Sequence, residues 1–171
     1  MLVCLVLLAA CGYTTHSLMP GEVNNLAVDV FGNDTFEREI EFTLTRELSR
    51  ELNQRAALRL TRRRHADAVL TGRIVRVSYP TLVETTNNEV SEQAVLVEAV
   101  VELKRLEDNK VITRFKLGNR AEFVVERGES RRTAFEEALR DLAEDIVNEL
   151  ERQSFHGDLE AVRHSSLDNP E

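Results

Sequence analysis

Cys11 is the residue whose surroundings point most directly to a chemical modification. Leu8, Ala9 and Ala10 precede it, and Gly12 follows it. An aliphatic residue and two small residues before a cysteine have the form of a bacterial lipobox, in which the small side chains fit a peptidase groove and the thiol receives a diacylglycerol. Cleavage before Cys11 would make residues 1–10 a signal peptide and leave a lipid-modified N-terminus.

The apolar run before Cys11 also admits a second interpretation, an ordinary buried strand or helix turn. No basic residues precede the run, although a secretory signal peptide normally begins with them. The run is too short to span a bilayer, which takes about 20 residues, and this favours the lipoprotein. A second acyl chain such as palmitate would strengthen the anchor, because one chain holds a protein only marginally. Cys4 would leave with the signal peptide, so no disulfide or cysteine metal site would remain.

Residues that could catalyse a reaction are scattered. Of the four histidines, only His65 lies close to a carboxylate, Asp67, and no serine or cysteine nucleophile lies in a turn nearby. The sequence contains no HExxH, GxSxG or P-loop motif. The carboxylates of Glu136, Glu137, Asp141, Glu144 and Asp145 fall on the polar side of a predicted amphipathic helix. We therefore expect no enzyme, no metal site and no cofactor.

The composition narrows the class of protein further. The net charge is −8 and tryptophan is absent, so neither a basic surface nor an aromatic stacking platform for nucleic acid is expected. No other apolar stretch is long enough to cross a membrane. We predict a lipidated tether over residues 11–24, a single α+β domain over 25–153 and a flexible polar tail over 154–171.

The first half of the predicted domain reads as strand, helix and short strand. Residues 26–31 alternate as a strand does, and residues 58–61 form a short strand candidate. Asp34 and Glu37 resemble a capping box that would start the helix. The helix has an apolar stripe at four-residue spacing, formed by Ile40, Leu44, Leu48 and Leu52. The two strands flanking this helix should lie parallel, joined by a right-handed crossover.

The second half reads as three longer strands and a final helix. Strands are expected over residues 68–79, where Pro80 ends the pattern, and over 94–106 and 111–126. Ser130 can cap a helix whose apolar face consists of Phe135, Ala138, Leu139, Leu142, Ile146, Val147 and Leu150. The expected fold is therefore a mixed sheet of about four to five strands with two amphipathic helices packed on one face.

Apolar residues occupy odd positions in the last two strands, and this restricts their pairing. Because side chains alternate with period two, both odd sets share a face only in registers where the numbers of directly paired residues sum to an even value. A three-residue loop over residues 108–110, with Asn109 able to adopt positive φ, pairs Leu103 with Phe115. The alternative register, with Leu103 facing Thr113, lacks direct charged pairs that the first one makes. We therefore predict the register that pairs Leu103 with Phe115, Val101 with Leu117, Val95 with Phe123, Glu102 with Lys116 and Glu98 with Arg120.

The opposite face of this hairpin combines cations with aliphatic side chains. Lys104, Arg114, Lys116 and Arg120 lie there with Leu96 and Val100, and Arg73 or Arg76 comes from the neighbouring strand. Arg and Lys bind phosphates and aliphatic groups bind acyl chains, so this face suits an anionic amphiphile. The simpler alternative is that Glu side chains neutralise these cations.

Several short motifs, taken in order, resemble the LptE family of lipopolysaccharide-assembly lipoproteins. Cys11-Gly12-Tyr13 is similar to the family's lipidated start, and residues 28–36 resemble its first strand and F-x-N-x-T turn. Residues 66–72 resemble its ADA-x-L-x-G strand. The final helix resembles its closing helix, so the resemblance covers most of residues 11–153.

The resemblance implies an outer-membrane lipoprotein on the periplasmic face that partners a large β-barrel, LptD, and assists lipopolysaccharide transport and insertion. It also allows lipopolysaccharide itself to be a ligand. The candidate contacts come from the hairpin face and not from the family's own binding residues, and they are Lys104, Arg114, Lys116 and Arg120. Gly12 stands where many enteric lipoproteins retained in the inner membrane have Asp, which favours sorting to the outer membrane. The alternative is a periplasmic lipoprotein subunit of another envelope or secretion complex without a lipid ligand.

Overall fold

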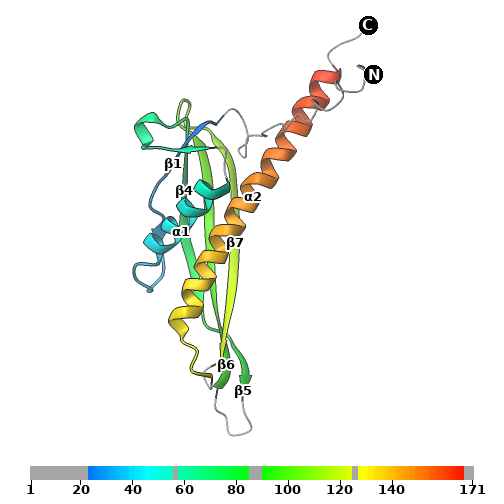
Figure 1. The fold of residues 1–171 in the computed structure, drawn as a ribbon. Coiled ribbons are helices and arrows are strands. Elements are labelled where there is room, and N and C mark those ends of the chain that lie inside the picture. Colours follow the sequence, from blue (N-terminus) through cyan, green and yellow to red (C-terminus); the bar gives the residue numbers. More distant parts are fainter. Residues whose placement is uncertain (1–22, 56–57, 85–89, 125–126, 168–171) are drawn as a thin grey trace, which may run out of the picture.

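The computed structural model describes residues 23–55, 58–84, 90–124 and 127–167 (Figure 1). Side chains are described over the same ranges except residues 83–91 and 154–167. Cys11, the predicted signal peptide and most of the predicted tether lie outside these ranges.

One sheet of seven strands forms the centre of the domain. Its main path runs β3–β1–β4–β6–β5, while β2 pairs with β4 and β7 pairs with β6. β1 is parallel to both β3 and β4, and β6 is antiparallel to β4 and β7, so the predicted mixed sheet is confirmed. The strands are β1 (Asn25–Val28), β2 (Gly32–Asn33), β3 (Arg59–Leu60), β4 (Ala68–Ser78), β5 (Thr81–Glu84), β6 (Val90–Arg105) and β7 (Val111–Val124).

β4 and β5 run in the same direction along β6, with a break at Pro80 between them. Ser78 pairs with Leu96 and Thr81 pairs with Gln93, so the two strands follow each other along one partner. Proline cannot donate a ladder hydrogen bond, but its carbonyl still accepts one from the Ala94 amide at 3.0 Å. The sequence predicted the end of β4 here and did not predict β5.

Helix α1 (Ile40–Arg55) buries the predicted stripe of Ile40, Leu44, Leu48 and Leu52. The predicted capping box at Asp34 and Glu37 is wrong, because the helix begins at Ile40, directly after Glu39 with its φ of 66°. Asp34 is bound to β4 instead, one residue after the end of β2. Its amide donates to the Ile74 carbonyl at 3.0 Å, and its carboxylate lies 2.6 Å from Arg73.

Helix α2 (Arg131–Leu167) begins as predicted at Ser130, whose hydroxyl accepts a hydrogen bond from the Thr133 amide at 3.2 Å. Its buried face is Ala134, Ala138, Leu139, Leu142, Ala143, Ile146, Val147 and Leu150, and Phe135 is partly buried beside it. The helix continues to Leu167, whereas we expected the ordered domain to stop at Gln153. Helical backbone hydrogen bonds need no apolar stripe, so loss of that pattern does not end a helix. Flexibility of the tail stays a prediction.

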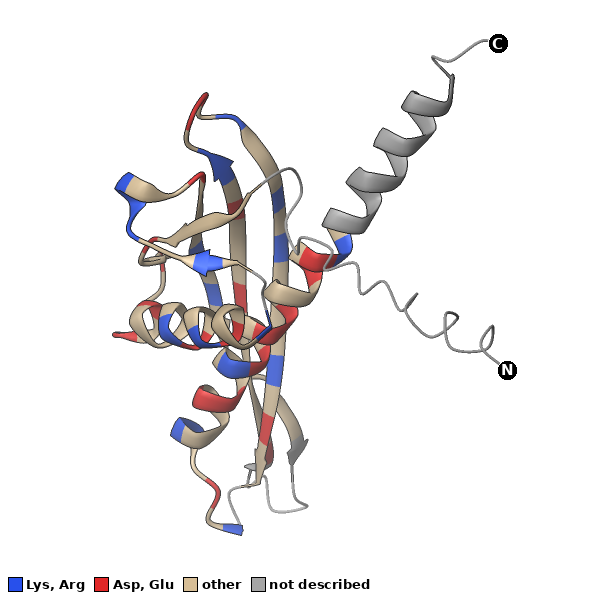
Figure 2. Cartoon of the chain, turned by 45° about the horizontal axis from the view of Figure 1, so that its top comes forward, with Lys and Arg blue, Asp and Glu red and all other residues tan. Residues whose placement is uncertain are grey.

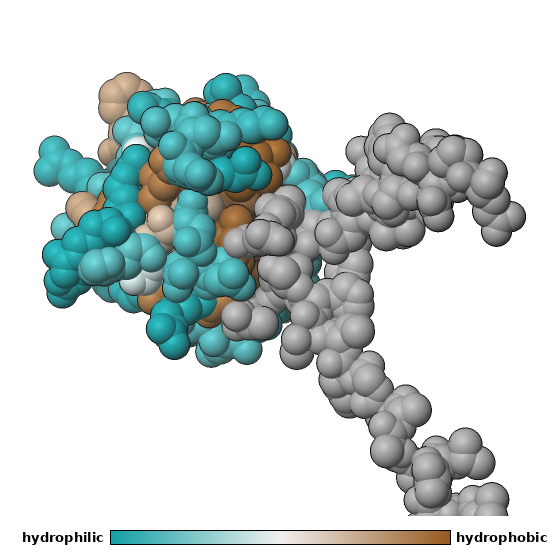
Figure 3. Space-filling model, turned by 90° about the horizontal axis from the view of Figure 1, so that it is seen from above, coloured by the Kyte–Doolittle hydropathy of each residue, from teal (hydrophilic) through white to brown (hydrophobic). Residues whose placement is uncertain are grey.

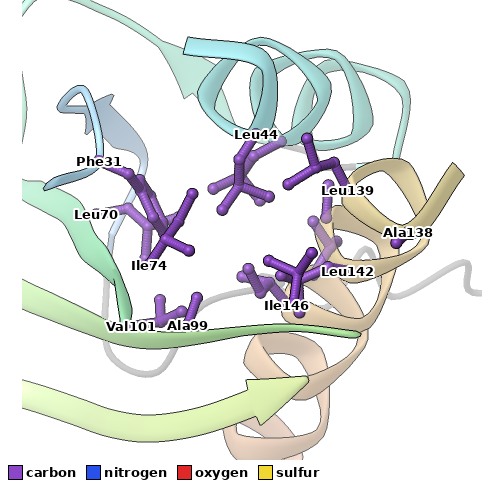
Figure 4. Packing of buried hydrophobic residues seen from close by; sticks show 14 of the residues in the cluster. Phe31, Leu44, Leu70, Ile74, Ala99, Val101, Ala138, Leu139, Leu142 and Ile146 are labelled. Carbon is purple, nitrogen blue, oxygen red and sulfur yellow. The ribbon is translucent and has the colours of Figure 1, made fainter. Parts of the chain in front are cut away.

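Both helices cover the same face of the sheet (Figure 1). Side chains from α1, α2, β4 and β6 point into the space between them and form one core (Figure 4). On β6, the five residues Val95, Val97, Ala99, Val101 and Leu103 are all 0% exposed. From above, polar residues cover most of the described surface and apolar residues show between them (Figure 3). The predicted arrangement, with two helices on one sheet face, is confirmed.

The β6–β7 hairpin confirms the predicted face and corrects the predicted register. The odd-numbered positions of β6 from Val95 to Leu103 and of β7 from Thr113 onward point inward, but Val111 pairs with Lys104 and is 43% exposed. Leu103 pairs with Thr113, and Val101 pairs with Phe115. The predicted partners of Leu103, Val101, Val95, Glu102 and Glu98 are therefore each displaced by two residues, to Thr113, Phe115, Ala121, Arg114 and Gly118.

The turn and a bulge together explain this register. Arg105 donates a backbone hydrogen bond to the Lys110 carbonyl at 2.9 Å, which makes the loop longer than predicted, with Asn109 at a φ of 56°. Continued without interruption, that pairing would put the two odd sets on opposite faces. An irregularity where Lys104 pairs with Val111 and Leu103 with Thr113 leaves Ile112 as the extra residue and restores the shared face.

We expect Leu48→Ala and Leu142→Ala each to lower the free energy of unfolding by about 2–5 kcal/mol, because each removes a fully buried side chain and leaves a cavity. Urea denaturation followed by circular dichroism measures the loss. Val111→Ala is the matched control, since Val111 is 43% exposed and should change stability little. Equal stability of all three variants would contradict the packing of both helices on the sheet.

Candidate functional site

The face of the sheet opposite the helices, here called the outer face, brings together all the basic residues singled out in the sequence. It consists of outward-pointing residues of β4, β6 and β7. Acidic and basic residues both occur along the strands (Figure 2). By the alternation of the paired strands, Lys and Arg outnumber Glu on this face. Its charged residues are Arg73, Arg76, Glu92, Glu98, Glu102, Lys104, Arg114, Lys116, Arg120 and Glu122.

Glu98 of β6 joins cations from the two neighbouring strands, β4 and β7. Its two carboxylate oxygens lie 3.7 Å from Arg76 of β4 and 3.0 Å from Lys116 of β7. Gly118 sits directly opposite Glu98 on β7, and a Cβ atom there would be 3.1 Å from the Glu98 Cγ and 3.2 Å from the Val97 carbonyl oxygen. The absence of a side chain at Gly118 therefore gives the Glu98 side chain room to lie across the sheet.

Glu102 forms a second cluster of the same kind. Its oxygens lie 2.7 Å from Lys104 and 3.8 Å from Arg114. Arg120 lies further along β7 and pairs with Glu122 at 2.8 Å. The predicted pairs of Glu102 with Lys116 and of Glu98 with Arg120 are wrong, because the observed register places Arg114 and Gly118 opposite these two carboxylates.

Each of these two carboxylates serves two cations, so the clusters retain positive charge. The basic side chains are also accessible, with exposures of 68% for Arg114, 52% for Lys116 and 54% for Arg120. Exposed ion pairs contribute only about 0–1 kcal/mol, so a competing anion can displace the carboxylate at small cost. Arg73, Lys104 and Arg114 border a shallow depression that also contains Thr71 and Val100. The arrangement can bind an anionic group beside an apolar one.

Phe31 and Gly72, which belong to the two strand motifs, pack against each other inside the domain. The Phe31 ring lies over the Gly72 backbone and is only 2% exposed. A Cβ atom at Gly72 would collide with that ring and would lie 2.7 Å from the Val100 carbonyl oxygen. These two residues therefore serve the close packing of the loop after β1 on β4, and they are not placed to contact a ligand.

Asn33 and Thr35 hold the turn between β2 and α1. The Asn33 side-chain oxygen accepts hydrogen bonds from the Thr35 amide at 2.9 Å and the Thr35 hydroxyl at 2.8 Å. Its amide nitrogen donates to the Glu37 carbonyl at 2.6 Å and the Glu41 carboxylate at 2.9 Å. The predicted F-x-N-x-T turn is thus locked through side-chain hydrogen bonds.

Asp67 ties the start of β4 to β1. Its carboxylate accepts hydrogen bonds from the backbone amides of Asn25 at 2.8 Å and Asn24 at 3.0 Å, and from the Asn25 side chain at 3.2 Å. The Asn25 backbone hydrogen bond is the largest of the effects that lower the pKa of Asp67 below its ordinary value. Asp67 therefore holds the start of β4 to β1 through three hydrogen bonds.

The structure offers little for the other classes of site. Within the described ranges, no group of His, Cys, Asp and Glu could hold a metal ion. Of the helices described here, none is long and apolar enough to cross a membrane. His65 is exposed in a short 3₁₀ helix (Arg63–His65), where Arg64 donates to its ring nitrogen at 2.9 Å. The same end of the sheet has a cleft that sequence reasoning missed, lined by Val23, Arg63, Arg64, Asp67 and Arg105 among others.

A model of one protein family matches residues 23–153, and its description is LptE, lipopolysaccharide-assembly. The match spans all the strands, α1 and the first part of α2. No curated protein matches the chain.

Solved structures of low sequence identity share the fold. A hypothetical protein from Chlamydia trachomatis is 12% identical with a TM-score of 0.58, covering 75% of this chain and 95% of its own. An uncharacterized lipoprotein B from Nitrosomonas europaea is 11% identical with a TM-score of 0.55, covering 81% and 88%. A PelC dodecamer from Paraburkholderia phytofirmans is 14% identical with a TM-score of 0.53, covering 78% and 92%. At these identities the likeness extends to the fold alone.

We expect Asp67→Asn to lower the free energy of unfolding at neutral pH, with a loss that shrinks in acid. The folded-state pKa of Asp67 is lowered, so the ionised carboxylate stabilises the fold above its unfolded-state pKa. That stabilisation disappears as the pH falls through the folded-state pKa. Urea denaturation of both proteins at about pH 7 and about pH 2.5 tests the sign. Asp141→Asn, on the exposed side of α2, is the control, and a pH-independent difference for Asp67→Asn would contradict the expectation.

Proposed function

The chain belongs to the LptE family of lipopolysaccharide-assembly proteins, and on this premise we propose that it is an outer-membrane lipoprotein that partners a large β-barrel translocon of the LptD type and assists lipopolysaccharide transport and insertion. The observation that carries the proposal is the family match over residues 23–153, which includes the whole sheet and both helix stripes.

The chemistry of the outer face supports direct contact with lipopolysaccharide. That lipid carries anionic groups beside acyl chains, and the outer face presents cations beside Leu96 and Val100. Lys104 and Arg114 share Glu102, and Lys116 shares Glu98 with Arg76, so a phosphate can recruit one cation of each cluster while the other stays beside the carboxylate. Arg120 extends the same charge along β7. We propose these four residues as the contacts.

A lipid anchor at Cys11 would keep this face close to the membrane. Residues 12–22 separate Cys11 from the first described residue, Val23, and would span at most ~40 Å when fully extended. The domain would therefore remain on the periplasmic face, within reach of a barrel in the same membrane.

A second candidate is a lipoprotein subunit of another envelope or secretion complex with no lipid ligand. The observation that favours it is that Lys104, Arg114, Lys116 and Arg120 each have a carboxylate neighbour within 4 Å, so none needs a ligand for its charge. Purification of the tagged chain separates the two functions. A large outer-membrane barrel in the eluate favours the first, and a ring or filament protein favours the second.

We expect Cys11→Ser to abolish lipid modification, because serine lacks the thiol that receives the diacylglycerol. Metabolic labelling with a fatty-acid analogue should mark the wild-type chain and leave the variant unmarked. Cys4→Ser is the control and should label like the wild type, since Cys4 would leave with the signal peptide. Equal labelling of the wild type and Cys11→Ser would refute lipidation at this cysteine.

We expect the double variant Arg114→Glu, Lys116→Glu to bind lipopolysaccharide about tenfold more weakly or worse, because it replaces attraction for phosphate with repulsion at two neighbouring positions. The loss should shrink in high salt. Binding to immobilised lipopolysaccharide and the melting temperature are measured on the same protein. The variant Arg114→Gln, Lys116→Gln is a second form of the test, because it removes the two cations without placing new carboxylates beside Glu98 and Glu102.

The matched control is Arg132→Glu, Arg140→Glu, which makes the same change in net charge on the exposed side of α2. Both residues are exposed and near carboxylates, Glu136 at 3.1 Å and Asp141 at 3.7 Å. Equal lipopolysaccharide binding by the β7 variant and this control would remove the outer face from the role and leave the barrel partnership standing.

A further inference from the structure

Phe36 is fully exposed on a turn that holds it in place. Its exposure is 105%, the highest among the described large apolar residues. Hydrogen bonds fix the turn on both sides of Phe36 in the sequence. Asn33 accepts hydrogen bonds from Thr35, and the Thr35 hydroxyl accepts one from the Glu37 amide at 3.3 Å. A fully exposed aromatic side chain contributes nothing to the core, whereas aromatic residues are enriched in protein interfaces, and the fixed backbone of the turn lowers the cost of using this one.

Phe36 borders a shallow groove whose lining is partly apolar and partly charged. Val75 and Val77 of β4 and Tyr79, the residue after β4, contribute its apolar part, and Arg76, Asp34, Thr35 and Glu37 line the rest. A bulge separates the pairs of Ile74 and Arg76 with β6, which makes Val75 an extra residue in β4. Bulges redirect side chains, and this one leaves Val75 beside the groove. We call this site the Phe36 groove.

The groove runs along an edge of β4 where no described strand pairs with it. β2 ends at Asn33, whose pairing partner is Ile74, and the Asp34 amide makes the last hydrogen bond to β4 on this side, to the Ile74 carbonyl. Over the described residues, no strand continues beside residues 75–78 of β4 on that edge. An open strand edge beside a partly apolar groove can accept an extended peptide, because a peptide supplies both backbone hydrogen bonds and side chains.

Acidic and basic side chains both border the groove. Arg73 lies 2.6 Å from Asp34, Arg76 shares Glu98 with Lys116, and Arg131 lies over the Tyr79 ring at 5.1 Å from its centroid. Glu37 accepts a hydrogen bond from Tyr79 and makes no ion pair with a described residue. A peptide with a Lys or Arg would pair with Glu37, and its backbone would hydrogen-bond to the open edge of β4, which a lipid cannot do.

We propose that the Phe36 groove is the docking site for an extended segment of the β-barrel partner, which carries apolar side chains and a Lys or Arg facing Glu37. This inference rests on the proposed function, since it names the surface through which that partner is bound. The segment lies along residues 75–78 of β4, continues the sheet beyond β2, and packs against Phe36.

Purified full-length chain and the LptD-type barrel of the same organism, both in detergent, provide the test. We expect Phe36→Ser to weaken binding about 10- to 100-fold, as the loss of an interface anchor does, without lowering the melting temperature. Phe36→Leu should retain most of the affinity, because it keeps an apolar side chain. Phe42→Ser is the matched control, since Phe42 is 58% exposed on α1 and does not line the groove. Amide hydrogen exchange at residues 75–78 should slow in the complex.

Failure of the inference and failure of the proposed function give different results. If the wild-type chain does not bind the barrel, both fail. If the wild type binds and Phe36→Ser binds equally well, or if Phe42→Ser loses as much affinity, the proposed function stands and the docking site is wrong. Unchanged exchange at residues 75–78 in a stable complex also overturns it. The docking site is also wrong if Phe36→Ser keeps full affinity for the barrel but loses binding to anionic phosphatidylglycerol vesicles or loses self-association.

Discussion

The burial of one face of β6 determines how the rest of this domain is arranged. β6 is the longest strand, it pairs with β4, β5 and β7, and its residues from Val95 to Leu103 alternate between fully buried and accessible. The buried aliphatic side chains require a cover of apolar surface, and α1 and α2 supply it with one stripe each. Since both helices are used on that face, the described elements leave the other face open. A sheet covered on one side only is therefore the structural basis of the candidate site.

The open face is charged because of the same alternation. Every second residue of β6 and β7 must point away from the core, and Glu98, Glu102, Lys104, Arg114 and Lys116 occupy those positions. The carboxylates of Glu98 and Glu102, each shared by two cations, hold the basic side chains in position without neutralising all of the positive charge. Such weak, accessible ion pairs suit a surface that binds and releases an anionic lipid, because little stability is lost when a pair opens.

The motifs that resemble the family serve the fold, and the proposed contacts lie elsewhere. Phe31 and Gly72 pack against each other, Asn33 locks the turn before α1, and Asp67 binds the start of β1. The same locked turn presents Phe36 to solvent beside an open edge of β4. A constraint that stabilises the domain thus also positions an exposed aromatic side chain, which connects the family's turn to the proposed interface.

The sequence alone determined the features that depend on local periodicity. These are the helix stripes, the inward face of the two hairpin strands β6 and β7, the cap at Ser130, and the set of cations that share the outer face. It could not determine the hairpin register, because the loop length and the extra residue at Ile112 compensate for each other, and either change alone would reverse a face. It also could not determine which carboxylate meets which cation, since Glu98 reaches Arg76 and Lys116 on two different strands. Only the tertiary structure decided these contacts and the groove at Phe36, because they join residues whose distance along the chain carries no information about their distance in space.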